Sequence, residues 1–439
     1  MPRRLVPALL ALAAIVLASC GGGGTNKVTG VQAVDANCGP VQYSGSGEPS
    51  KLVVSDLPLQ GDSAERSKQQ NDAIVQEMAR KGWQAGKDIQ VAFQACDDSL
   101  ASTGEWDENL CRSNAQAYAS NPDVVGVIGT YNSGCAAIEI PVLNRAPGGG
   151  LAMVSPGNTY VCLTEPGSIC KANEPGVYYP SGKRNYIRVV PNDAVQMAGL
   201  ATFADEQGIR NPYVLVAAKD PTSQGQADTF EGAAKSLGMK IAGVEHWDQK
   251  AKSYTDLMAK VKASGADAVL LAGLLEQNGA ELIKDKVSVL GPNDGAVKLL
   301  APDGFAQQST IDQAGPPAVG MFASLPGKVP SSLTGKGAEF VAELKSQVGS
   351  EPLELFAPYA GEAAEVLLPA IQSGNGTRAG VIASLFKTHV TDGIVGSFSI
   401  APSGDPTPAP ISVSEAAGTF KLAQTIIPRP QLVTAARGG

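Results

Sequence analysis

Two loops rich in Ser, Gly, Asn and Thr carry the clearest binding chemistry in the 439-residue sequence. They span residues 129–134 (GTYNSG) and 155–159 (SPGNT), and each follows an apolar run typical of a buried strand. The candidate ligand-binding residues in these loops are Tyr131, Ser133, Gly134, Ser155, Gly157, Asn158 and Thr159. Free backbone N–H groups at a helix start, with a hydroxyl beside them, can bind a carboxylate. Simple caps and turns are the alternative explanation of both loops.

Catalytic signatures are absent from the sequence, which contains no GxSxG, HExxH or GxxxxGK[ST] motif. The two histidines, His246 and His389, are predicted to be surface or capping residues. Lys and Arg number 34 against 42 Asp and Glu, giving a net charge of −8. A protein that binds nucleic acid through general electrostatics needs a basic surface. We therefore predict that the chain is not an enzyme, uses no cofactor or metal, and has no nucleic-acid partner.

The N-terminus has the features of an export signal. Arg3 and Arg4 precede an apolar stretch, residues 5–18, that is too short to span a bilayer as a helix. The stretch ends in Leu-Ala-Ser-Cys, which resembles the bacterial lipobox, so residues 1–19 are predicted to be a lipoprotein signal peptide and Cys20 the lipidated residue. A secretory signal with a chance cysteine is the alternative. Residues 20–50 are predicted to be a flexible tether between the lipid and an extracytoplasmic body.

Six cysteines follow Cys20, and an even number in an exported chain indicates disulfides. They are Cys38, Cys96, Cys111, Cys135, Cys162 and Cys170. Fifteen pairings are open to six cysteines. Short loops favour Cys162–Cys170 and Cys96–Cys111, which leaves Cys38–Cys135 by elimination.

Strand-like and helical patterns alternate along the body, as βα units require. Strand-like runs begin at Lys51, Asp88, Val124 and Leu151, and a second series begins at Tyr186, Pro212, Lys240, Ala266 and Val297. After a further strand at Val319 come helical stretches at 338–348, 360–372 and 379–386, and then strand-like pieces around a Pro-rich turn at 401–410. Runs that are apolar on both faces suit parallel strands covered by helices. The sequence therefore predicts an α/β protein with two doubly wound lobes, in which the chain returns to the first lobe.

One long segment resembles a known family. Residues Gly129–Thr164, together with VVSDLPLQG at 53–61 and PDGF at 302–305, are similar to the extracytoplasmic substrate-binding proteins of branched-chain amino acid ABC transporters. The resemblance implies the type I periplasmic-binding-protein fold, with two Rossmann-like lobes and three crossovers. By position, these crossovers should fall near 188–192, 325–328 and 393–398. The implied N-terminal lobe is 51–190 plus 326–393, and the C-terminal lobe is 191–325 plus 394–430.

The same resemblance assigns roles to individual residues. Ser133 and Thr159 match positions that hold a ligand carboxylate, and Asp303 matches the acid that takes the α-ammonium. Asp62 is implied to line the pocket from the first lobe. Gln224 lies where the family carries a tyrosine, and Leu274 lies near the position of another family aromatic, so an amide, a urea-like compound or an aromatic acid stays open as the ligand.

The resulting functional hypothesis is a monomeric, lipid-anchored receptor that captures a small amino-acid-like ligand and delivers it to ABC permease subunits. A ligand-sensing receptor subunit on the same fold, and an enzyme on the same fold, are the alternatives.

Overall fold

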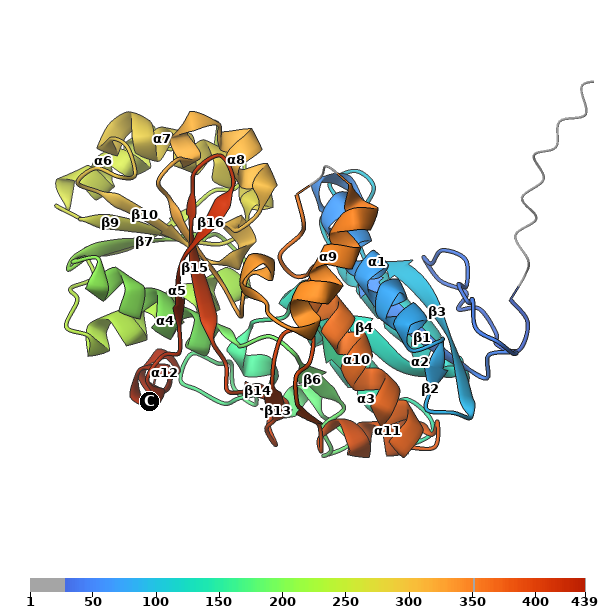
Figure 1. The fold of residues 1–439 in the computed structure, drawn as a ribbon. Helices are drawn as coiled ribbons and strands as arrows, with labels where there is room; N and C mark the ends of the chain where they lie inside the picture. Colours follow the sequence, from blue (N-terminus) through green and yellow to red (C-terminus); the bar gives the residue numbers. More distant parts are fainter. Residues whose placement is uncertain (1–27, 350–351, 439) are drawn as a thin grey trace, which may run out of the picture.

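The computed structural model describes residues 28–349 and 352–438, apart from the side chains of Asp62 and Pro221. Within these residues the chain forms two main sheets, one in each of two lobes that lie side by side (Figure 1). Cys20 and the predicted signal peptide lie outside the described residues, so the lipidation site stays a prediction. None of the helices in the described part combines the length and apolar character that spanning a membrane would require.

The N-terminal lobe has a sheet of order β2-β3-β1-β4-β5-β6, parallel except for the short edge strand β2. Its strands are β1 (Lys51–Leu57), β2 (Gln84–Ala85), β3 (Ile89–Asp97), β4 (Val124–Gly129), β5 (Ala152–Ser155) and β6 (Tyr186–Arg188). Its helices are α1 (Ala64–Arg80), α2 (Glu108–Ser120), α3 (Ser133–Asn144), α9 (Lys336–Val348), α10 (Ala357–Ser373) and α11 (Arg378–Leu385). β1 and β4 are buried along almost their whole length, because helices cover both faces of the sheet.

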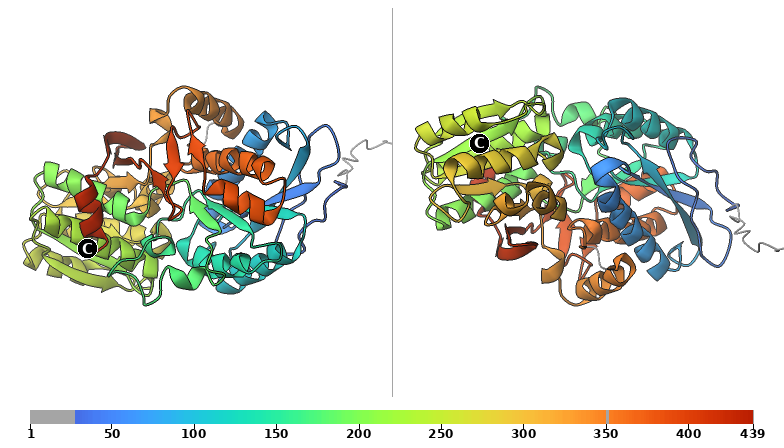
Figure 2. Two further views of the ribbon diagram at one scale, coloured as in Figure 1. Left: turned by 90° about the horizontal axis from the view of Figure 1, so that it is seen from below. Right: turned by 90° about the horizontal axis from the view of Figure 1, so that it is seen from above.

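The C-terminal lobe has a sheet of order β16-β15-β11-β10-β9-β7-β8, in which β15 and β16 are antiparallel to their neighbours. Its strands are β7 (Pro212–Ala217), β8 (Gly243–Trp247), β9 (Ala268–Ala272), β10 (Lys298–Ala301), β11 (Phe322–Leu325), β15 (Ile411–Ala416) and β16 (Phe420–Ile426). Its helices are α4 (Asp193–Glu206), α5 (Pro221–Ser236), α6 (Thr255–Ala263), α7 (Gly279–Leu290), α8 (Gln308–Ala314) and α12 (Pro430–Ala436). The last of these, α12, packs against α4 and α5 (Figure 2). The predicted fold class is confirmed.

The chain passes between the lobes three times. The first two passages, between β6 and α4 and between β11 and α9, fall at or next to the predicted crossovers. The third falls later than the predicted 393–398, because β12 (His389–Val390), β13 (Phe398–Ile400) and β14 (Pro406–Thr407) pair with one another before the chain enters β15. Phe398 and Ile400 pack in the core of the N-terminal lobe, so the assignment of this stretch to the C-terminal lobe is wrong. The other domain boundaries stay predictions.

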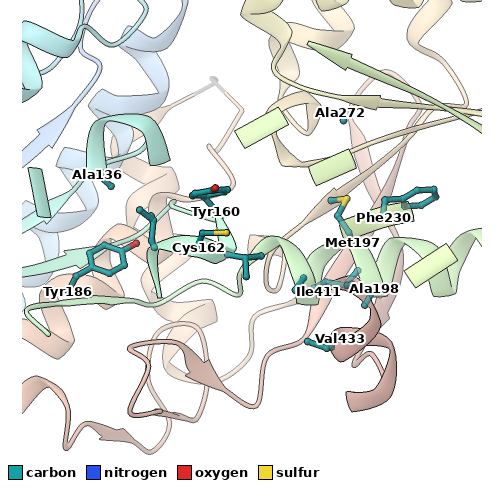
Figure 3. Packing of buried hydrophobic residues seen from close by; sticks show 14 of the residues in the cluster. Ala136, Tyr160, Cys162, Tyr186, Met197, Ala198, Phe230, Ala272, Ile411 and Val433 are labelled. Carbon is teal, nitrogen blue, oxygen red and sulfur yellow. The ribbon is translucent and has the colours of Figure 1, made fainter. Parts of the chain in front are cut away.

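A continuous hydrophobic cluster joins the two lobes near the first passage. Tyr160 and Cys162, which follow β5, lie between core residues of the N-terminal lobe such as Ala136 and residues of α4 such as Met197 (Figure 3). The connection between the lobes is therefore packed where the chain first crosses.

The cysteines form three disulfides, Cys38–Cys96, Cys111–Cys135 and Cys162–Cys170. The predicted Cys162–Cys170 bond is confirmed, and the Cys96–Cys111 and Cys38–Cys135 pairings are wrong. Cys38 lies opposite Cys96 in an isolated bridge to β3, while α2 and α3 pack together and bring Cys111 to Cys135. Sequence separation therefore predicted only the Cys162–Cys170 pairing, which closes the shortest loop.

Residues 28–50 are not a free tether, contrary to the prediction for 20–50. In addition to the disulfide, the Gln42 and Gly39 amides donate to carbonyl oxygens of β3 at 2.7 and 2.8 Å. Val34 is buried, and its amide donates to Gln94 Oε1 at 2.8 Å. This segment pairs with a strand of the sheet through backbone contacts that its sequence composition did not indicate.

Candidate ligand-binding site

A cleft of about 590 Å³ lies between the lobes and continues into a deeper pocket of about 40 Å³. We call this deeper cavity the interlobe pocket. It is lined by Trp106, Tyr131, Asn132, Ser133, Gly134, Gly157, Thr159, Asp220, Thr222, Gln226, Leu274 and Asp303. These residues follow the carboxyl ends of β4, β5, β7, β9 and β10, or precede α2, as expected for a site between doubly wound sheets.

The start of α3 gives the N-terminal lobe a wall of hydrogen-bond donors. The residue before the helix, Asn132, makes no side-chain cap, and the first turn contains no acidic residue. The first N–H groups of α3 are thus left for a ligand, and the helix dipole favours an anion there. The backbone amides of Thr159 and Tyr160 both donate to Ser133 Oγ at 3.2 Å. Because Ser133 Oγ already accepts two hydrogen bonds, its own hydrogen is available to donate to a ligand.

Ser155 and Asn158, two of the predicted binding residues, do not line the interlobe pocket. Ser155 Oγ accepts from the Gly157 and Asn158 amides at 3.1 and 2.8 Å. Asn158 Nδ2 donates to the carbonyl oxygens of Thr130 and Tyr131 at 2.8 and 3.0 Å. Both side chains are fully buried and hold the 129–134 and 155–159 loops against each other. Their role is to shape the wall that Ser133 and Thr159 present.

Gly134 allows an aromatic side chain to approach the helix start. A Cβ atom at this position would lie 2.4 Å from Cζ2 of Trp106. Any larger residue would therefore push Trp106 away from α3. Trp106 lines both cavities, although no sequence motif marks it for the site.

The wall from the C-terminal lobe is acidic. Asp303 is 8% exposed, and Gln196 Nε2 donates to its Oδ1 at 2.9 Å. Burial raises the pKa of Asp303 to about 6, although the hydrogen bond from Gln196 opposes the shift. Asp193 lies fully buried at the start of α4, where burial and then the charge of Asp303 raise its pKa to about 8.

Asp220 adds a second carboxylate to this wall and caps α5. Its Oδ1 accepts from the Thr222 amide at 3.0 Å, and its Oδ2 accepts from Ser223 Oγ and Gln277 Nε2, each at 2.7 Å. The start of α5 is therefore occupied by the protein's own anion, whereas the start of α3 is open.

Gln224 lies outside the interlobe pocket, contrary to its prediction as a binding residue. Its Oε1 is 3.0 Å from His246 Nε2, and its Nε2 donates to Asp228 Oδ1 at 2.8 Å. In a helix, residues four apart share a face, so Thr222 and Gln226 face the pocket while Gln224 points elsewhere. His246 is exposed, as predicted.

Sequence reasoning identified six residues that the structure brings together in the interlobe pocket: Tyr131, Ser133, Gly134, Gly157, Thr159 and Asp303. Asp62 lies in a short 3-10 helix, Gly61–Ser63, and its side chain is outside the described atoms, so its role stays a prediction. Sequence reasoning missed Trp106, Asp220, Thr222 and Gln226. The usable signal was Asp220-Pro221 directly after a strand, which is a helix-start pattern.

Several known proteins are similar to this chain. A family model described as periplasmic binding protein matches residues 84–415. The Leu/Ile/Val-binding protein homolog 2 of Brucella abortus is 24% identical over 385 residues, covering 86% of this chain and 93% of that protein. Solved structures also share the fold, among them the following two. The leucine binding protein LivK of Thermotoga maritima has a TM-score of 0.73 and 19% identity, with 86% of this chain and 99% of that chain covered. A solute binding protein from R. palustris in complex with 4-hydroxybenzoate has a TM-score of 0.71 and 18% identity, with 87% and 98% covered. The chain belongs to the periplasmic binding protein family, whose members bind solutes and are not enzymes.

Proposed function

We propose that this protein is a lipid-anchored receptor on the outer face of the cytoplasmic membrane that captures a zwitterionic amino acid between its lobes and delivers it to an ABC importer. The observation that carries the proposal is the opposite polarity of the two walls of the interlobe pocket. One wall presents the uncapped start of α3, and the other presents Asp303.

The ligand carboxylate is assigned to the N-terminal lobe. The open N–H groups at the start of α3 and the Ser133 hydroxyl supply donors on that side, and Thr159 lines the pocket beside them. Hydrogen bonds to a charged acceptor stabilise more strongly than neutral ones. The matching helix start in the C-terminal lobe is capped by Asp220, which disfavours a carboxylate on that side.

The ligand ammonium is assigned to Asp303. This carboxylate is buried, has one oxygen bonded to Gln196, and lines the interlobe pocket. Trp106 and Leu274 line both cavities, so a side chain leaving the α-carbon would pass between them into the larger cleft.

Aromatic carboxylic acids are the second candidate ligand class, because the R. palustris relative is in complex with 4-hydroxybenzoate. Such a ligand would use the same donor wall and would leave the Asp303 carboxylate facing an uncharged ring or a phenol hydroxyl. A buried carboxylate without a cationic partner is unfavourable. The amino-acid assignment therefore accounts for both walls, and the aromatic-acid assignment accounts for one.

A ligand screen followed by calorimetry tests the proposal. The protein would be screened by thermal shift against amino acids, amides and benzoates, and each hit would be measured with Ser133→Ala and with Gln224→Ala as the control. Loss of one hydrogen bond to a charged group should weaken binding by ~1.5–3 kcal/mol in Ser133→Ala. Gln224→Ala should bind as the unaltered protein does, because its side chain is directed away from the pocket. Binding of benzoates alone, or an unchanged affinity in Ser133→Ala, would contradict the assignment.

A further inference from the structure

The guanidinium of Arg66 lies between the two lobes at the edge of the ligand site. Arg66 belongs to α1 of the N-terminal lobe, and its side chain is 8% exposed. Its Cζ atom lies 4.1 Å from the centre of the Tyr131 ring, and its Nη2 donates to Ser63 Oγ at 2.9 Å. These contacts hold the guanidinium against the wall that Tyr131 contributes to the interlobe pocket.

The same guanidinium reaches two loops of the C-terminal lobe. Its Nη1 donates to Gln307 Oε1 at 2.9 Å and to Glu276 Oε1 at 3.3 Å, and the Glu276 side chain is 14% exposed. Glu276 lies two residues after Leu274, and Gln307 lies four residues after Asp303. Leu274 and Asp303 both line the interlobe pocket.

Hydrogen bonds connect Gln307 and the neighbour of Glu276 to the pocket-lining parts of the two C-terminal-lobe loops. Gln307 Nε2 donates to the Gly304 carbonyl oxygen at 3.1 Å, next to Asp303. Gln277, which follows Glu276, accepts from the Leu274 amide at 2.8 Å through its Oε1. Arg66 therefore contacts the segments that carry Tyr131, Leu274 and Asp303 at once.

We propose that Arg66 is a positioning residue that holds the lobes in the closed, binding-competent arrangement by joining the Tyr131 wall to the loops that carry Leu274 and Asp303. Separation of the lobes breaks the contacts from Arg66 to Glu276 and Gln307 together. The ion pair is largely buried, so it is screened less by solvent and salt than an exposed surface pair. Part of the closed arrangement is then present before any ligand binds. This inference concerns the closure of the lobes and holds whichever solute is the ligand.

A second arginine on α1 provides a matched control. Arg80 Nε donates to Glu343 Oε2 at 2.9 Å, and its Cζ lies 5.1 Å from the centre of the Phe340 ring. Both partners are on α9, in the same lobe as Arg80. The pair thus combines an ion pair with an aromatic contact, as Arg66 does, but it does not join the lobes.

Hydrogen exchange of the ligand-free full chain tests the proposal, with bound solute first removed by unfolding in guanidinium chloride and refolding with the disulfides intact. The variants are Arg66→Gln, Glu276→Gln and the double variant, with Arg80→Gln as the control. In Arg66→Gln and Glu276→Gln, amides in 274–277 and 303–307 should exchange about tenfold faster, since opening of the lobes exposes them. The double variant should exchange little faster than Arg66→Gln alone, because Arg66→Gln already removes the contact to Glu276. Arg66→Lys should restore part of the protection.

Several outcomes would overturn the proposal. Unchanged exchange in 274–277 and 303–307 for both single variants would show that the contact does not hold the lobes. The same local increase in Arg80→Gln would show that any loss of an arginine on α1 loosens the cleft. If Arg66→Gln raises exchange throughout the cores of both lobes, the substitution has destabilised the fold. The proposal is then tested by Glu276→Gln and Arg66→Lys. Without a local increase in Glu276→Gln and local protection in Arg66→Lys, the proposal fails.

Discussion

Replacement of Asp303 by asparagine should separate the charge of this residue from its shape. Asparagine has nearly the same volume and keeps an oxygen that can accept from Gln196 Nε2, which now lies 2.9 Å from Asp303 Oδ1. The interlobe pocket should therefore keep its form while it loses a negative charge. Asp303 is 8% exposed, so a ligand ammonium beside it would be largely removed from water.

The expected loss of affinity is large. Removal of one partner from a buried, hydrogen-bonded ion pair costs ~3–5 kcal/mol, because the other charge remains without compensation. Each ~1.4 kcal/mol is a factor of ten, so Asp303→Asn should bind an amino-acid ligand more than about a hundredfold more weakly. Calorimetry would compare the amino acid with its analogue lacking the amino group, in both proteins. The unaltered protein should discriminate strongly between the two ligands, and Asp303→Asn should discriminate weakly.

The affinity should also depend on pH. Burial raises the pKa of Asp303 to about 6 in the ligand-free site. Below that pH the carboxyl is protonated and cannot pair with an ammonium, so affinity should fall about tenfold for each further pH unit. This decline should be absent in Asp303→Asn. His246→Ala, at an exposed position, is the control. Equal affinity of Asp303→Asn and the unaltered protein for the amino acid would refute the assignment of the ammonium.

Three further changes test the anchor, the N-terminal segment and a buried acid. Cys20→Ala should release the protein from membranes or leave it unprocessed, which fractionation would detect; a variant still membrane-bound with unaltered mobility would contradict lipidation. The Cys38–Cys96 bond closes a loop of 58 residues. Its loss in Cys38→Ala should cost about 4 kcal/mol in the chain-entropy model, measured by guanidinium unfolding, and an unchanged midpoint would contradict this. Burial, and then the charge of Asp56, raises the pKa of Asp98 well above its ordinary value. Because the pKa of Asp98 is higher in the folded than in the unfolded protein, protonation of Asp98 stabilises the folded state in acid. This contribution to the free energy of unfolding is lost as the pH rises. Asp98→Asn should therefore raise the thermal midpoint more at pH 8 than at pH 5, and an equal change at both pH values would contradict the reasoning.

The sheet strands were predictable because their local sequences already carry the tertiary pattern. Runs such as Leu52-Val53-Val54 are apolar on both faces, as strands covered by helices on two sides must be. The attachment of residues 28–50 was not predictable in this way. It depends on backbone hydrogen bonds and a disulfide to β3, more than 50 residues away, and neither leaves a periodic signal. The third passage between the lobes was misplaced for a related reason, since Phe398 and Ile400 are short apolar pieces that either lobe could bury.

Some residues of the candidate site were likewise predictable from the sequence, and others were not. Tyr131, Ser133, Gly134 and Thr159 come from loops that follow neighbouring strands of one sheet, so their proximity follows from local order along the chain. Trp106 reaches Gly134 from the loop before α2, in the same lobe but far away in the sequence. The residues of the opposite wall come from the other lobe, so their position depends on how the two lobes are placed in the whole fold.

The polarity of the site depends on how two equivalent helices begin. Both α3 and α5 start just after a parallel strand and face the interlobe pocket with their first turns. Asp220 caps α5 with a carboxylate, whereas Asn132 gives α3 no side-chain cap. One helix start therefore attracts an anion, and the other is already neutralised and adds an acid to its wall. With Asp303 on the acidic side, this difference in capping would orient the proposed zwitterionic ligand with its carboxylate facing α3 and its ammonium facing the C-terminal lobe. Gln224 was mispredicted because the sequence alone does not show where α5 begins. The helix begins at Pro221, after the cap at Asp220, and this start places Thr222 and Gln226 on the face toward the pocket and Gln224 on another face.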